Sequence, residues 1–109
     1  MNISNINDCI ANSLEDKDCI VIRIPDNRFN HDTIFDALNN ALTAKISRFP
    51  DTIINRDYIT DALVSDIIKG CDYVKDNSQL GFLVFPTEYG LLRIALISIY
   101  YIIFWDFTE

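Results

Sequence analysis

The chain has 109 residues, of which 50% are hydrophobic, so we expect a single globular domain over residues 1–109 with one core of ordinary size. It carries 9 basic and 16 acidic residues, a formal net charge of -7. This charge opposes binding to nucleic acid or to an anionic membrane surface, and it would instead attract a cationic partner.

The cysteines and the first residues indicate where the protein resides. Three cysteines at wide, uneven spacing, Cys9, Cys19 and Cys71, form neither a disulfide framework nor a CxxC pair. They are typical of reduced thiols in a cytosolic protein. The N-terminal residues have neither the basic start nor the long apolar run of a secretory signal. We therefore expect a cytoplasmic protein.

The first third of the chain predicts a helix and a strand. Apolar residues at helical spacing predict an amphipathic helix over residues 3–14: Ile3, Ile6, Ile10 and Leu14. The β-branched run of residues 19–25 predicts a largely buried strand. Arg23 within it indicates a position at the end or the edge of a sheet.

The middle of the chain predicts two consecutive helices. An apolar stripe marks the first one, which runs from Asp32 and ends before Pro50: Phe35, Leu38, Leu42 and Ile46. A second stripe over residues 55–70 predicts another helix, and Gly70 stands where a helix commonly ends.

The C-terminal third can be divided in two ways. Residues 80–86 predict a short buried strand that ends at Pro86. Thr87 is a suitable N-cap, so we expect a helix over 87–97, followed by a β-branched and aromatic strand over 99–105. In the alternative division, residues 80–86 and 90–98 form a hairpin around the sequence PTEYG.

These elements define the expected fold class. Strands separated by helical crossovers are usually parallel, which predicts an α/β domain with a small three-stranded, mainly parallel sheet covered by helices. The alternative is an α+β domain with an antiparallel C-terminal hairpin.

The longest apolar run, residues 94–105, is too short for the roughly 20 residues that span a membrane, so we expect no membrane contact. An apolar strand at the edge of a sheet can pair with a second copy of the chain, so the sequence is also compatible with a homo-oligomer.

Residues for catalysis or for metal binding are not arranged in any recognisable pattern. His31 is the only histidine, and no serine or cysteine beside it has the setting of a nucleophile. The cysteines and this histidine form no ligand pair, and three scattered glycines form no phosphate-binding loop. We therefore predict no catalytic residues, no metal, no cofactor and no enzyme activity.

Aspartates recur through the second long helix and its flanks, and they carry the candidate site. They are Asp51, Asp57, Asp61, Asp66, Asp72 and Asp76. Asp57 and Asp61 are expected one turn apart on one helix face, and the neighbouring Tyr58 is a typical interface anchor. A solvated acidic face is one interpretation. The other is a partner-binding face formed by Asp57, Tyr58, Asp61 and Asp66, which meets lysines and arginines of a partner.

The order of elements and four short strings resemble the barstar family of small acidic ribonuclease inhibitors. The strings are FDALNNAL (35–42), FPD (49–51), TDAL (60–63) and TEYG (87–90). The resemblance covers residues 19–107 and implies a strand, two helices, a strand, a helix and a last parallel strand. It implies an inhibitory surface on the second paired helix, where Asp61 lies in the matching TDAL string.

The resemblance also indicates a function. The chain is similar to toxin-immunity proteins in general, such as those of contact-dependent inhibition systems. It implies an immunity or inhibitor protein that blocks the active cleft of a cognate basic toxin, above all a nuclease, and that binds no nucleic acid directly. The alternative is a nucleic-acid mimic or phage-type antagonist whose carboxylates replace phosphates on a DNA-binding enzyme. A small enzyme with unrecognised carboxylate chemistry is the third hypothesis.

Overall fold

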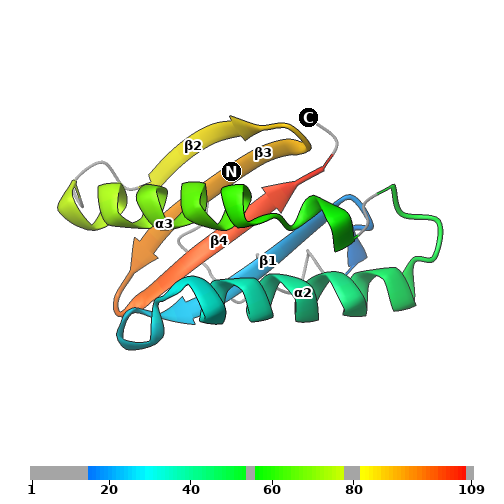
Figure 1. The fold of residues 1–109 in the computed structure, drawn as a ribbon, viewed down its shortest axis with the longest axis horizontal. Coiled ribbons are helices and arrows are strands. Elements are labelled where there is room, and N and C mark those ends of the chain that lie inside the picture. Colours follow the sequence, from blue (N-terminus) through cyan, green and yellow to red (C-terminus); the bar gives the residue numbers. More distant parts are fainter. Residues whose placement is uncertain (1–14, 54–55, 78–81, 108–109) are drawn as a thin grey trace.

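The computed structural model describes residues 15–53, 56–77 and 82–107. One sheet has the strand order β1-β4-β3-β2, in which all neighbours are antiparallel: β1 (Cys19–Pro25), β2 (Phe82–Thr87), β3 (Gly90–Ile97) and β4 (Tyr100–Asp106). Two helices, α2 (His31–Arg48) and α3 (Asp61–Asp76), lie side by side against one face of this sheet (Figure 1). The chain therefore has an α+β fold.

The predicted three-stranded, mainly parallel sheet is wrong, because the expected helix over 87–97 is the strand β3. Glu88 and Tyr89 form a two-residue turn that joins β2 to β3 as a hairpin, as in the alternative division. Gly90 ends this turn at a φ of 120°, where a Cβ atom would lie 1.9 Å from the Asp106 carbonyl oxygen. A helix cannot contain that conformation.

A second tight hairpin joins β3 to β4 and fixes the antiparallel order. Ile97 pairs with Tyr100 across a two-residue turn in which Ser98 has a φ of 57°. Positive φ at the first turn residue matches the twist of the paired strands. The predicted strand over 99–105 is confirmed with a shift of one residue, and β1 is an outer strand in which Arg23 is exposed, as predicted.

The two helices begin at capping residues that the sequence contains. The Asn30 side chain accepts a hydrogen bond from the Thr33 N–H at 2.9 Å and starts α2, which ends before Pro50 as predicted. The Thr60 hydroxyl accepts from the Leu63 N–H at 3.1 Å and starts α3. The predicted end of this helix at Gly70 is wrong, because α3 continues to Asp76.

Gly70 has a packing role instead. It is buried in the middle of α3, and a Cβ atom on it would lie 2.7 Å from Cδ1 of Ile94 on β3. The missing side chain therefore lets α3 approach the sheet closely. A glycine within an apolar helical pattern can mark a close contact as well as a helix end.

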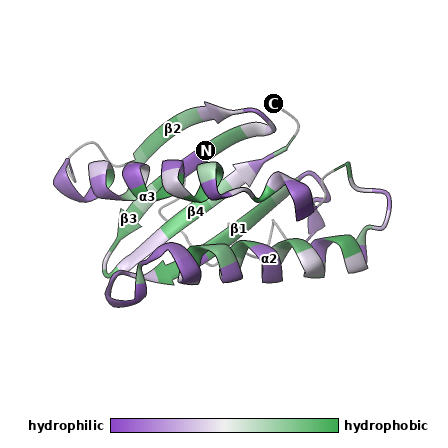
Figure 2. Ribbon diagram, in the orientation of Figure 1, coloured by the Kyte–Doolittle hydropathy of each residue, from purple (hydrophilic) through white to green (hydrophobic). Residues whose placement is uncertain are grey.

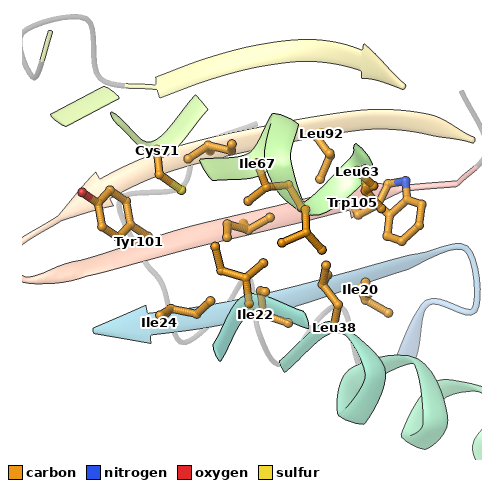
Figure 3. Close-up of a cluster of buried hydrophobic side chains, with 14 of the residues drawn as sticks. Ile20, Ile22, Ile24, Leu38, Leu63, Ile67, Cys71, Leu92, Tyr101 and Trp105 are labelled. Carbon is orange, nitrogen blue, oxygen red and sulfur yellow. The ribbon is translucent and has the colours of Figure 1, made fainter. Parts of the chain in front are cut away.

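The core lies between the helices and the sheet. Figure 3 shows Leu38 of α2 and Ile67 of α3 facing strand residues such as Ile22, with Tyr101 and Trp105 at opposite ends of the cluster. The hydropathy colours in Figure 2 show largely apolar strands beneath two amphipathic helices. Within the described parts of the chain, no helix is long and apolar enough to cross a membrane. The predicted helix over 3–14 lies outside the described residues.

The buried thiols should be unreactive in the folded state. Burial raises the pKa of Cys19 to about 12 and also raises that of Cys71, so few thiolates exist at pH 8. In a Cys9→Ser variant, which leaves these two thiols, we expect labelling by a disulfide reagent at the rate of global unfolding. Rapid labelling of either thiol in the absence of denaturant would contradict this burial.

Candidate acidic tyrosine pocket

A pocket of about 170 Å³ lies where three segments meet: the short 3-10 turn η2 (Arg56–Tyr58), the first half of α3 and the β2–β3 turn. Three carboxylates and three aromatic rings line it, and we call it the acidic tyrosine pocket: Asp57, Asp66, Glu88, Tyr58, Tyr89 and Trp105. The carboxylate residues are exposed at the rim, and the two tyrosines are half-buried. The pocket therefore combines negative charge with an aromatic wall.

The aromatic wall is held in place from below. The rings of Tyr58 and Tyr89 stack with 3.7 Å between their centroids and 6° between their planes. Trp105 is fully buried, and its indole N–H donates to the Tyr89 carbonyl oxygen at 3.1 Å. Thr87 accepts from the Tyr89 N–H at 3.2 Å and donates to the Gly90 carbonyl at 2.8 Å. These bonds fix the hairpin turn against the core.

The electrostatics of the pocket favour a cation. The Glu88 carboxylate raises the pKa of Tyr89, with smaller contributions from desolvation and from Tyr58, as expected for a phenol in a negative potential. Neither lysine nor arginine is among the described residues that line the pocket. The carboxylates at the rim contribute a negative potential to the pocket.

Three of the four predicted partner-binding residues meet in this pocket. Asp57 and Tyr58 reach it from η2, and Asp66 reaches it from α3. The expected pairing of Asp57 and Asp61 on one helix face is wrong, because Thr60 caps α3 and leaves Asp57 outside the helix. Asp61 lies 3.4 Å from Nε2 of His31 instead, with 88% of its side chain exposed.

Sequence reasoning missed Glu88, Tyr89 and Trp105. All three come from the C-terminal third, where the preferred division placed Glu88 and Tyr89 in a helix and Trp105 in a strand. The alternative division, with a hairpin around PTEYG, contained the sequence pattern from which these residues could have been predicted. Its turn projects Glu88 and Tyr89 toward the start of α3, and β4 places Trp105 below them.

Other parts of the described chain offer less chemistry. A pocket of about 410 Å³ between α2 and β1 is lined by Lys45 and Arg48. Lys45 Nζ donates to the Asp16 carbonyl oxygen at 2.6 Å, and Arg48 lies 2.7 Å from Glu15, so both cations are engaged. In the residues that the structure describes, no three histidine, cysteine or acidic side chains gather as a metal site.

Comparison of the chain with family models, curated proteins and solved structures gave no match. The described fold also departs from the barstar-like order that the short strings implied. The TEYG string forms the β2–β3 turn where that order has a helix, and the last strand is antiparallel to its neighbours.

Proposed function

We propose that the chain is an immunity or inhibitor protein that binds a cationic toxin domain, above all a nuclease, through the acidic tyrosine pocket. The observation that carries this proposal is the convergence of Asp57, Asp66 and Glu88 around a stacked tyrosine pair. A lysine or arginine that grips phosphate in a nuclease cleft would find carboxylates at the rim and aromatic faces for cation–π contact inside.

The size of the pocket supports a side chain as its occupant. Pockets for small-molecule ligands commonly measure about 300–1,000 Å³, and this one measures about 170 Å³. Tyrosines surrounded by polar residues are typical of the centres of protein interfaces. The pocket is therefore better suited to one inserted basic side chain than to a substrate.

The geometry favours this function over a nucleic-acid mimic. A mimic needs carboxylates in rows at phosphate spacing along an extended surface. The three pocket carboxylates instead surround one compact aromatic wall, and Asp61 lies outside it against His31. This arrangement is typical of a single anchored contact.

Co-expression tests the proposed function. The products of the reading frames on either side of the gene are each expressed in a bacterial host, alone and with this chain. We expect one basic product to arrest growth alone and to lose its toxicity with the chain, and a direct complex to be isolated. If neither product is both toxic and neutralised, the immunity function is contradicted.

Charge reversal separates the pocket from the rest of the acidic surface. Asp66→Lys should weaken binding to the cationic partner about 100-fold, or about 2.7 kcal/mol, because it places a repelling charge at the pocket. Asp61→Lys makes the same charge change on the same helix but outside the pocket, so we expect a loss below about tenfold, mainly in the association rate. Titration calorimetry at two salt concentrations measures both, and equal losses would contradict the role of the pocket.

A further inference from the structure

Exposed apolar side chains lie on both sides of the strand β2. Phe82 and Val84 on β2 are 45% and 43% exposed, and Tyr73 on α3 is 49% exposed. Side chains alternate along a strand, so Phe82 and Val84 face away from α3, and Tyr73 lies on the helix side. None of these side chains has a role in the proposed function.

A groove between α3 and β2 lies on the helix side of the sheet. It measures about 290 Å³ and is lined by Asp66, Lys69, Gly70, Tyr73, Leu83 and Phe85. Gly70 contributes no side chain, which leaves Leu83 and Phe85 of β2 accessible from the groove. Asp66 lines both the groove and the acidic tyrosine pocket, so the two cavities adjoin.

The free edge of β2 lies between these apolar surfaces. β2 is the last strand in the order β1-β4-β3-β2, and no described strand lies beyond it. Pro86 suits this position because its nitrogen can face the free edge, where no hydrogen bond to β3 is needed. Backbone groups alternate along a strand, so the N–H groups of Val84 and Phe82 face the same edge.

We propose that an extended segment of the cationic partner pairs with the free edge of β2 as a fifth strand. This inference rests on the proposed function and names the kind of partner segment. Side chains of β2 that face α3 are Leu83 and Phe85 in the groove and Thr87 at the acidic tyrosine pocket. The partner strand therefore places an apolar side chain in the groove and a lysine or arginine at the pocket, two or four residues apart on one face.

Charge favours a cationic segment over a second copy of this chain at the same edge. The chain carries a net charge of -7, and Asp66 and Glu88 flank the end of β2 where the strands would meet. Two copies would bring these carboxylates together, whereas a basic segment neutralises them.

Selection from a displayed library of short random peptides tests this strand addition. Bound sequences should carry a basic and an apolar residue two or four positions apart. A synthetic peptide of this pattern should bind about tenfold more weakly to Val84→Pro, which removes an edge N–H, and about tenfold more weakly to Asp66→Lys. Val84→Lys is a second variant in case the proline disturbs folding. It places a charge on the edge strand, which disfavours pairing with another strand. In the complex, amide exchange of Phe82 and Val84 should slow.

The outcomes distinguish the two proposals. Peptides that lose affinity with Asp66→Lys but bind both Val84 variants fully would contradict strand addition and leave the cationic pocket standing. Selected peptides without basic residues, insensitive to Asp66→Lys, would contradict both. Sedimentation of the chain alone tests whether a second copy occupies the edge of β2. A dimer that the Val84 variants abolish would show that it does and would overturn the inference.

Discussion

Replacing Gly90 with alanine should cost the protein about 4 kcal/mol of unfolding free energy, a value at the upper end for single substitutions. The new Cβ would lie 1.9 Å from the Asp106 carbonyl oxygen, and that atom belongs to the backbone of β4, one of the two inner strands. Side-chain rotation cannot relieve the clash. The φ of 120° adds strain for any residue with a Cβ atom.

Urea denaturation followed by the fluorescence of the single tryptophan measures this loss. Ser98→Gly is the matched comparison, since Ser98 holds a φ of 57° in the other tight turn. Glycine adopts this conformation freely but enlarges the unfolded ensemble, so we expect a change within about 1 kcal/mol. A Gly90→Ala variant as stable as the wild type would show that the β2–β3 turn has a different conformation.

Truncation of Trp105 should have the second large effect, on both stability and the pocket. Trp105 is fully buried, packs edge-on against Phe107 at 5.0 Å between ring centroids, and donates to the Tyr89 carbonyl. Trp105→Ala should destabilise the fold by about 3–5 kcal/mol, because the cavity cannot be refilled. Circular dichroism during urea denaturation measures this value without the tryptophan signal.

Trp105→Phe removes the hydrogen bond while it keeps an aromatic ring in the core. Phenylalanine retains most of the ring but leaves the Tyr89 carbonyl without its indole donor, at a cost of about 1–3 kcal/mol. Since the bond positions the tyrosine wall, partner binding should weaken more than that of a variant equally destabilised elsewhere, such as Ile22→Val. Equal affinities of the two variants would show that Tyr89 needs no support from Trp105.

Much of the fold could be predicted wherever the pattern depends on neighbouring residues alone. The strand β1 and the helix α2 follow from the β-branched run and the apolar spacing of their residues. The second helix was predicted over 55–70, whereas α3 runs from Asp61 to Asp76. The sheet order could not be predicted, because it depends on two tight turns whose backbone conformations the residue types only suggest. Thr87 fits a helix cap and a hairpin end equally well, and only its bonds to Tyr89 and Gly90 distinguish them.

The candidate site was predicted in part for the same reason. Asp57, Tyr58 and Asp66 are close in sequence, so their proximity was expected. Glu88 and Tyr89 come from a distant hairpin, and their position depends on the antiparallel pairing of β2 with β3. The acidic helix face of the prediction is therefore replaced by a pocket between a helix and a hairpin, with Asp61 outside it.

The affinity of two triple variants for the cationic partner tests the pocket most directly. Asp57→Asn with Asp66→Asn and Glu88→Gln neutralises the pocket and changes the net charge from -7 to -4. The matched variant has the same net charge and replaces exposed aspartates outside the pocket with asparagine: Asp36, Asp72 and Asp76. We predict a loss of about 100-fold or more for the first and below about fivefold for the second. Equal losses would show that binding depends on net charge and would contradict recognition through the acidic tyrosine pocket.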